Sequence, residues 1–246
     1  MIRVDVVFDT ICPWCYIGKR RLERALALRP HVRASLHWHP FLLNPDMPPS
    51  GISREVYLER KFGSPHRIQR ILDNLAVTGQ GDEICFQFDR IERTPSTIHS
   101  HRLIRFAARY GMQSDLVERI FQAYFAQYRD IGQIAELVQI GVEAGLPERE
   151  LRLFLDSDEE MLTVLHENAR AHRLGVSGVP SFLFEEGFAI AGAQEPDVIA
   201  RLIDLSWETC SARQKLSHGD LNLSNQDLAS QPDLASPNLA DSDFVA

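Results

Sequence analysis

This sequence has few cysteines, no long apolar segment and no excess of basic residues. It contains four cysteines in 246 residues, and 26 Lys and Arg against 34 Asp and Glu give a net charge of −8. This acidic balance, without a basic stripe, argues against nucleic acid as a partner. No apolar run approaches membrane-spanning length, so we expect no membrane anchor. Residues 1–8 lack the basic and apolar parts of a secretory signal, which predicts a cytoplasmic location.

Two of the cysteines form a Cys-x-x-Cys pair between a predicted strand and a predicted helix. The apolar run 2–8 has the length of a buried strand, and the residues after the pair are apolar at helical spacing. Pro13 suits the first position of a helix, which places Cys12 at or next to the N-cap. The helix dipole there favours a thiolate, so Cys12 is the predicted nucleophile. Cys15, one turn further along the same face, is predicted to resolve a mixed disulfide.

Three other interpretations of the pair compete with a redox role. A structural zinc site needs a second pair of ligands at suitable spacing, and Cys85 and Cys210 stand alone, so we predict no metal. A structural disulfide is uncommon in a reducing compartment. Two packed cysteines without a function are the third alternative. The order of strand, Cys-x-x-Cys and helix favours redox chemistry over all three.

A second strand and a proline-rich loop follow the first predicted helix. Apolar and polar side chains alternate over residues 32–39, which is the period of a half-buried strand. His37 and His39 lie on its polar side, where a solvated histidine is more common than a catalytic one. The proline-rich segment 40–49 predicts an ordered loop.

The pattern between residues 53 and 174 is helical. Ser64 and Ser114 are the predicted N-caps of two helices, and Gly145 is the predicted end of another. The aromatic residues within 121–125 recur at helical spacing, which predicts core positions, with a substrate groove as the alternative. Because strands occur on both sides of this helical block in the sequence, we expect it to be an insertion.

Strands return near residue 180 and complete the fold prediction. Phe182 and Phe184 alternate with other residues, a turn follows at 185–187, and residues 188–190 form the second arm of a hairpin. A closing helix is predicted from residue 196. With the cysteine pair at the first strand–helix junction, this order predicts an α/β thioredoxin fold with a large all-helical insertion between the second and third strands.

Three regions are expected from these patterns. Residues 1–50 and 175–208 form a discontinuous thioredoxin-like domain, and residues 51–174 form a helical insertion domain. Residues 209–246 are rich in Ser, Asp and Asn and contain near repeats, which predicts a low-complexity, disordered tail.

Motifs spread over residues 1–205 point to one family. They are 9–18 (DTICPWCYIG), 38–47 with its Pro-Phe and Asn-Pro-Asp, 100–103 (SHRL), 123–125 (AYF), 174–182 (LGVSGVPSF) and 190–194 (IAGAQ). In this combination the chain resembles the DsbA-like thioredoxin-fold family and, within it, the cytoplasmic FrnE-like branch. The tail after residue 210 lies outside the resemblance.

The resemblance implies a site that combines the two ends of the chain. Pro180 would be a cis-proline facing the cysteine pair, with the Val179 backbone available to an extended substrate. The implied catalytic residues are Cys12, Cys15 and Pro180. The implied substrate contacts are Pro13, Trp14, Phe41, Asn44 and Val179.

The chain also departs from its relatives. Trp14 stands where strongly oxidising members have a histidine, so no imidazolium stabilises the thiolate and we expect a less oxidising couple. After the Ala-Tyr-Phe motif, Gln127-Tyr128 replaces the Glu-Gly of many relatives. Asp9 is a candidate proton acceptor for Cys15, with a capping or loop carboxylate as an equal alternative.

The predicted function is that of a thiol-disulfide oxidoreductase acting on disulfides or dithiols of proteins or small molecules. We expect no cofactor, with glutathione as a candidate co-substrate. The alternative is a glutathione-dependent isomerase of the 2-hydroxychromene-2-carboxylate type or a kappa-class glutathione transferase, which resemble this chain but typically carry serine at the position of Cys12. A non-enzymatic interaction module that uses the helical block and tail is a third hypothesis, and a homodimer is a candidate assembly.

Overall fold

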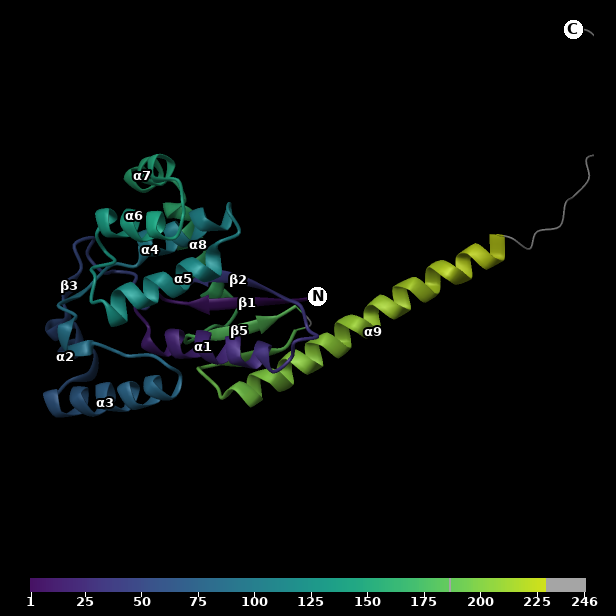
Figure 1. Ribbon diagram of the computed structural model, residues 1–246, viewed down its shortest axis with the longest axis horizontal. Coiled ribbons are helices and arrows are strands. Elements are labelled where there is room, and N and C mark those ends of the chain that lie inside the picture. Colours follow the sequence, from purple (N-terminus) through teal and green to yellow (C-terminus); the bar gives the residue numbers. More distant parts are fainter. Residues whose placement is uncertain (186, 229–246) are drawn as a thin grey trace, which may run out of the picture.

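A four-stranded sheet lies at the centre of the computed structural model, which describes residues 1–185 and 187–228, with side chains as far as Arg213 (Figure 1). The strands are β1 (Ile2–Phe8), β2 (Ala34–Pro40), β5 (Ser181–Phe184) and β6 (Ala189–Ala191), in the order β2-β1-β5-β6. β1 is parallel to β2 and antiparallel to β5, and β5 pairs with β6 as the predicted hairpin. This topology confirms the predicted thioredoxin fold.

β1 is a central strand whose two faces differ. Val4, Val6 and Phe8 are at most 1% exposed on one face, whereas the other face carries Arg3 and Asp5 before Val7, which is 3% exposed. Both faces are therefore covered where the strand approaches the cysteine pair. The strand therefore fixes the position of the cysteine pair that follows it within the interior of the molecule.

Helices cover both faces of this sheet (Figure 1). α1 (Pro13–Ala27) packs along α9 (Pro196–Leu228), which also contacts β1. On the same face, α5 (Gln113–Phe121) contacts β2, and its Phe121 packs against Phe8 of β1. α8 (Met161–Arg173) contacts β2 from the other face, where Glu167 lies beside His39. Among the described helices, none is both long and apolar enough to cross a membrane.

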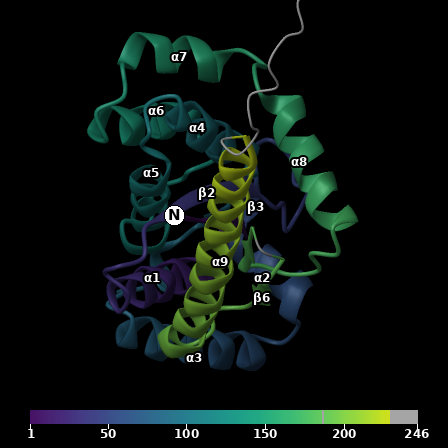
Figure 2. The same ribbon diagram turned by 90° about the vertical axis from the view of Figure 1, so that its right-hand side faces the viewer.

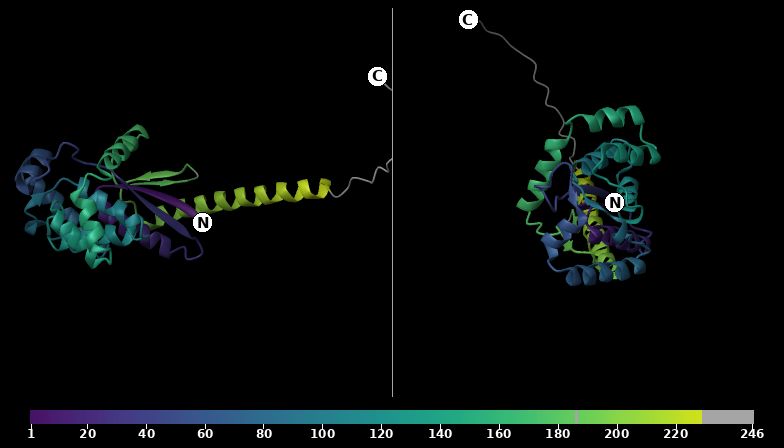
Figure 3. Two further views of the ribbon diagram at one scale, coloured as in Figure 1. Left: turned by 90° about the horizontal axis from the view of Figure 1, so that it is seen from above. Right: turned by 90° about the vertical axis from the view of Figure 1, so that its left-hand side faces the viewer.

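The remaining elements all belong to the insertion between β2 and β5. They are β3 (Ile52–Ser53), α2 (Arg54–Phe62), α3 (Pro65–Gly81), the 3₁₀ turn η1 (Phe88–Arg90), β4 (Arg93–Thr94), α4 (Ile98–Ala108), the π-helical turn η2 (Gln122–Ala126), α6 (Ile134–Glu143) and α7 (Glu148–Asp156). Figure 2 shows α7 and α3 on opposite sides of the molecule. Figure 3 shows that the distal part of α9 extends away from the sheet and the helices around it.

Two details of the insertion differ from the sequence prediction. The insertion is not all-helical, because β3 and β4 pair in a small antiparallel sheet, with Ile52 opposite Thr94. Strands of two residues are too short to show an alternating pattern. The predicted N-cap at Ser114 is wrong, because α5 begins at Gln113 and its N-cap is Met112. Ser114 Oγ instead accepts a hydrogen bond of 2.9 Å from Trp38 Nε1.

The closing helix is longer than predicted. α9 continues to Leu228, past the expected domain boundary at residue 208, so residues 209–228 of the predicted disordered tail are helical. The composition of this segment disfavours a helix, but Ile199 and Ile203 are fully buried and anchor the first turns. Once packing has nucleated a helix, adding further residues costs little. Residues 229–246 of the predicted tail lie outside the described residues.

One apolar core joins the sheet and the insertion. Phe121, Tyr124 and Phe125 are at most 1% exposed, which confirms the predicted core positions. The ring of Tyr16, in the helix after the first cysteine, stacks on Phe121 with 4.9 Å between centroids. The insertion therefore packs directly on the helix that carries the cysteine pair.

Candidate active site

The cysteine pair lies where β1 ends and α1 begins. Cys12 is the N-cap of α1, with φ −91° and ψ 112°, and Pro13 follows at the start of the helix, as predicted. The Cys12 carbonyl accepts hydrogen bonds from the backbone N–H groups of Cys15 and Tyr16 at 3.0 and 3.3 Å. No side chain caps this helix. The positive end of its dipole is therefore available to stabilise a thiolate at Cys12.

Cys15 is the deeper of the two thiols. It is 2% exposed, against 5% for Cys12, and neither cysteine forms a disulfide. Burial, followed by the hydrogen bond and charge of Cys12, raises the pKa of Cys15 well above its ordinary value, and a backbone hydrogen bond from Asp9 offsets part of that rise. Because only a thiolate attacks a disulfide, Cys15 needs an acceptor for its proton before it can react.

The loop before β5 reaches the pair from the other end of the chain. The Val179–Pro180 peptide bond is cis, as the resemblance implied. Cys12 Sγ lies 3.8 Å from the carbonyl oxygen of Val179, although 167 positions separate the two residues. Pro180 is buried and Val179 is half-buried. The structure thus brings together the residues that the sequence assigned to the site from opposite ends of the chain.

Gly18 makes this close approach feasible. A Cβ atom at Gly18 would lie 2.7 Å from Pro180 Cγ and 3.3 Å from the ring of Phe182. Carbon atoms do not approach each other to 2.7 Å, so a larger residue in α1 would push the proline loop away. Gly18 belongs to the matched motif, but the sequence did not predict its contact with Pro180.

Asp9 and His101 form a buried polar pair beside the cysteines. They are 0% and 1% exposed, and Asp9 Oδ1 lies 3.4 Å from His101 Nε2. The second carboxylate oxygen, Oδ2, accepts a hydrogen bond of 2.8 Å from the Leu43 N–H. Within the described residues, Oδ1 of Asp9 and both ring nitrogens of His101 have no hydrogen-bond partner.

Sequence reasoning did not single out His101. The residue falls in the matched motif 100–103, and its helical pattern shows only that the position faces the core. The signal that could have found it is a histidine next to a second polar residue on a buried helix face. That neighbour, Ser100, donates to the Thr97 carbonyl at 2.8 Å and shares a hydrogen bond of 2.7 Å with Thr10, just before the cysteines.

The residues predicted to contact substrate have different surroundings. Trp14 is 42% exposed beside Cys12. Asn44 lines a cavity of about 600 Å³ together with Tyr57 and Lys61, and its Nδ2 donates to the Tyr57 hydroxyl at 3.3 Å. Phe41 is 5% exposed, and its ring packs against His172, which gives it a place in the core. Among the described residues, no three His, Cys, Asp or Glu side chains gather as ligands for a metal ion.

Comparisons with known proteins agree with this fold. The family model described as DSBA-like thioredoxin domain matches residues 3–204. The uncharacterized protein YwbO of Bacillus subtilis is 25% identical over 208 residues, which cover 82% of this chain and 96% of that protein.

Solved structures give the same result. The probable DsbA oxidoreductase SCO1869 from Streptomyces coelicolor is similar with a TM-score of 0.79 and 29% identity, covering 85% of this chain and 91% of that one. The cytosolic disulfide reductase DsbM from Pseudomonas aeruginosa with GSH has the same fold, with a TM-score of 0.63, 19% identity and coverages of 84% and 99%. The chain belongs to the DSBA-like thioredoxin domain family.

Proposed function

We propose that this protein is a thiol-disulfide oxidoreductase in which Cys12 is the nucleophile and Cys15 the resolving thiol. The observation that supports this most directly is the position of Cys12, at the N-terminus of α1 and 3.8 Å from the Val179 carbonyl. A helix N-terminus favours a thiolate, and an exposed backbone edge can hold an extended substrate. Membership of a family of disulfide oxidoreductases and isomerases agrees with this chemistry.

The reaction proceeds in two exchange steps. The Cys12 thiolate attacks one sulfur of a substrate disulfide, a Cys12–substrate disulfide forms, and the other substrate sulfur leaves as a thiolate. Cys15 then gives up its proton to Asp9 and attacks Cys12 Sγ. The Cys12–Cys15 disulfide forms, and the second substrate thiolate leaves and takes up a proton. The substrate gains two electrons and the cysteine pair loses two; the reverse sequence oxidises a dithiol.

The first experiment follows the reduction of a fluorescent peptide disulfide with glutathione as reductant. We expect Cys12→Ser to reduce turnover to the uncatalysed rate and Cys15→Ala to accumulate a peptide adduct on Cys12, detected by mass spectrometry under non-reducing conditions. Cys85→Ser is the matched control, because Cys85 is exposed and separate from the pair, and we expect full activity. Full activity of Cys12→Ser would contradict the proposal.

We also propose glutathione as the co-substrate that returns the pair to its dithiol form. Leu43 also lines the cavity that Asn44 lines, and the Leu43 N–H donates a hydrogen bond to Asp9. This cavity therefore lies next to the site. Arg60 and Lys61 also line it. Two cationic side chains suit the two carboxylates of this tripeptide. The fold relative DsbM has GSH in its structure.

This assignment is tested by the Kd for glutathione, measured by calorimetry. We expect Lys61→Met to raise the Kd about tenfold, which is the loss of one charge-assisted contact. Arg67→Met is the control, because Arg67 is exposed and does not line the cavity. Equal Kd values for the two variants would show that glutathione does not use this cavity. A glutathione-dependent isomerase or transferase, the alternative function, would keep its activity in Cys15→Ala.

A further inference from the structure

We propose that His101 is a positioning residue for the exchange reaction, which holds Asp9 in place and shares the proton that Cys15 must lose. This inference rests on the proposed function, because Cys15 loses its proton only in such an exchange. His101 acts through Asp9: His101 comes from α4, Asp9 follows the end of β1, and both the backbone and the charge of Asp9 act on Cys15 in α1.

The first argument is the lack of any other partner for these buried atoms. A buried carboxylate or imidazole is costly unless it has a hydrogen-bond partner. The Leu43 N–H satisfies only Oδ2 of Asp9. Oδ1 faces His101 Nε2 at 3.4 Å, and within the described residues neither atom has a hydrogen bond. A proton between Asp9 Oδ1 and His101 Nε2 would therefore give both groups a hydrogen-bond partner.

The second argument is the balance of charge around Cys15. A lone Asp9 carboxylate repels the Cys15 thiolate, and its charge is one of the causes that raise the pKa of Cys15. When the proton of Cys15 passes to Asp9 and is shared with His101 Nε2, the Asp9–His101 pair gains one positive charge as Cys15 becomes negative. The total buried charge stays constant, which avoids the cost of adding a charge to the interior.

Two buried cationic side chains of α1 and α4, Lys19 and Arg102, already have other partners. Lys19 lies one turn after Cys15 in α1 and is 3% exposed, but its Nζ pairs with Glu23 at 2.5 Å and Glu118 at 2.8 Å. Arg102, next to His101 in α4, donates to carbonyl groups at the end of α7. Neither side chain is available to share a proton with Asp9.

The test separates the two exchange steps with one probe. Dithiobis-nitrobenzoate is an aromatic disulfide whose thiolate product is coloured, so attack by Cys12 releases one equivalent and attack by Cys15 releases a second. The full chain is used with Cys85 and Cys210 replaced by serine, so that these two accessible thiols add no signal of their own. Stopped-flow absorbance then gives the rate of each step.

We expect His101→Gln to slow the second release at least about tenfold and to change the first less than about twofold. Glutamine keeps an N–H that can donate to Asp9 but cannot take up a proton, so it separates proton sharing from simple hydrogen bonding. His99→Gln is the matched control in the same helix, because His99 contacts Arg102, and we expect both rates to be unchanged.

A double variant tests whether His101 acts through Asp9. If it does, Asp9→Asn combined with His101→Gln is no slower in the second release than Asp9→Asn alone. The inference is wrong if the rate reductions of the two substitutions multiply in the double variant. It is also wrong if the second release in His101→Gln is as fast as in the parent chain. If no first release occurs in the parent chain, the proposed function itself fails, which is a separate outcome from a failure of the His101 assignment.

Discussion

The two cysteines of the pair differ in what they need in order to react. Cys12 stands at a helix N-terminus, where the dipole and the unpaired N–H groups already favour a thiolate. Cys15 is buried, its pKa is raised, first by burial, and it needs a neighbouring base. This asymmetry supports the proposed order of the steps, in which Cys12, the less buried thiol at the helix N-terminus, attacks the substrate first.

The contact between Gly18 and Pro180 gives a direct test of how the two ends of the chain form one site. Alanine at Gly18 would place Cβ 2.7 Å from Pro180 Cγ, so we expect Gly18→Ala to lower the free energy of unfolding by about 1–3 kcal/mol. Gly81→Ala is the control, because a Cβ there meets no atom within 4 Å. Denaturant titration of both variants checks this. Equal stability of the two variants would show that the proline loop does not pack on Gly18.

The sequence predicted those site residues that follow local rules. Pro13 sets the start of a helix by itself, so Cys12 at the N-cap could be derived from neighbouring residues. The approach of Pro180 came only from the resemblance, and the Asp9–His101 pair was missed, because tertiary contacts leave no local pattern.

Tyr128, a departure from the family pattern, adopts φ +50°, and the Arg90 guanidinium lies 3.8 Å from its ring centroid.

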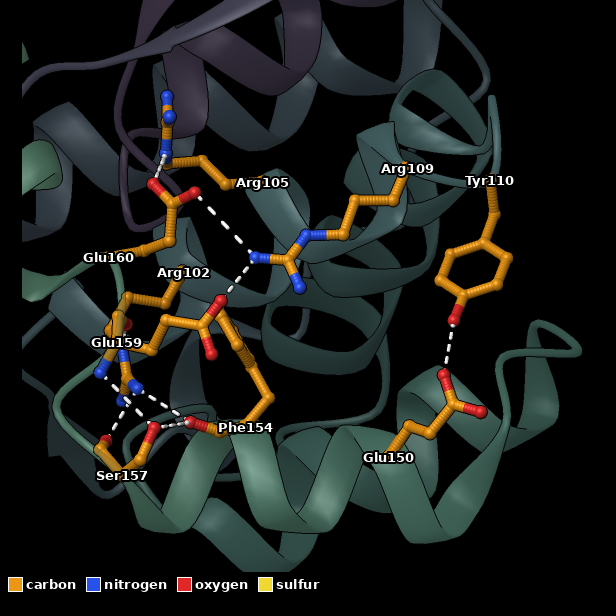
Figure 4. A network of polar contacts seen from close by, with 9 residues as sticks. All are labelled: Arg102, Arg105, Arg109, Tyr110, Glu150, Phe154, Ser157, Glu159 and Glu160. Carbon is orange, nitrogen blue, oxygen red and sulfur yellow. Dashed lines mark hydrogen bonds and ion pairs between the residues drawn. The ribbon is translucent and has the colours of Figure 1, made fainter.

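Among the secondary-structure elements, α7 is held to α4 by a buried arginine. Arg102 is 0% exposed, and its guanidinium donates to the carbonyl groups of Phe154, Ser157 and Glu159 (Figure 4). It also donates to the carbonyl group of Leu155. Carbonyl groups at a helix C-terminus have no partner within the helix. One side chain of α4 therefore closes the end of α7 and fixes the chain that leads to α8.

Removing this guanidinium is expected to be costly. We expect Arg102→Met to lower the free energy of unfolding by about 3 kcal/mol or more, because several buried carbonyl groups lose their partners together. Hydrogen exchange is expected to become faster first in α7. Arg109→Met, at the C-cap of the same helix, is the matched control, because Arg109 is 44% exposed and pairs with Glu159 at the surface. A loss of stability in Arg102→Met no larger than in this control would contradict the assignment.

His39 connects two strands to a helix through a pH-dependent contact. Its Nε2 lies 2.9 Å from Asp5 in β1, and its Nδ1 lies 3.8 Å from Glu167 in α8. Burial acts to lower the pKa of His39, but the neighbouring carboxylates of Glu167 and Asp5 outweigh it and raise the pKa above the ordinary 6.5. Burial also opposes the shifts of the two carboxyl groups, but Arg3 and His39 lower the pKa of Asp5, and His39 and Arg105 lower that of Glu167.

These shifts predict a stability that depends on pH. A histidine whose pKa is raised by folding contributes its full stabilisation at pH values below its unfolded-state pKa of 6.5. This contribution disappears as the pH rises through its folded-state pKa. We therefore expect the stability advantage of the wild type over His39→Gln to fall by roughly 0.5–1 kcal/mol between about pH 6 and about pH 8. His166→Gln, at an exposed position of α8, is the control. A difference that is independent of pH would contradict the prediction.

Element boundaries were predictable where packing and local sequence agree. β1 and α1 have both a clear period and a proline at the junction, and their bounds were anticipated. β3 and β4 were missed, because the pairing of Ile52 with Thr94 joins two segments that lack a pattern of their own. Ser114 has the chemistry of an N-cap, but its hydroxyl is held by Trp38, and the helix begins one residue earlier.

For the whole molecule, polar contacts as well as the shared core hold the insertion on the thioredoxin-like part. Asp82, at the end of α3, accepts hydrogen bonds from Arg21 and Arg24 of α1 at 2.7 and 2.9 Å. Arg21 also donates to the carbonyl of Ala193, just before α9. Because α1 carries the cysteines and contacts both regions, unfolding of either region would disturb the site.

Truncation of α9 tests whether the distal part of this helix contributes to the stability of the fold. In Figure 1 this segment points away from the sheet, whereas Ile199 and Ile203 are fully buried near its start. A chain that ends after Arg213 is therefore expected to lose less than about 0.5 kcal/mol of unfolding free energy. Ile203→Ala in the full chain is expected to lose about 2–5 kcal/mol, because it opens a cavity against the core.

Denaturant titration of the truncated chain, the Ile203→Ala variant and the full chain measures both effects. The exchange rates of the cysteine pair are expected to be the same in the truncated and full chains, because α1 contacts α9 and lies beside its first turns, which remain (Figure 1). A truncated chain that is as unstable as Ile203→Ala would mean that residues beyond 213 contribute to folding, either by packing on the same molecule or in a second copy. Stability that depends on protein concentration in the full chain, but not in the truncated one, would identify the second copy.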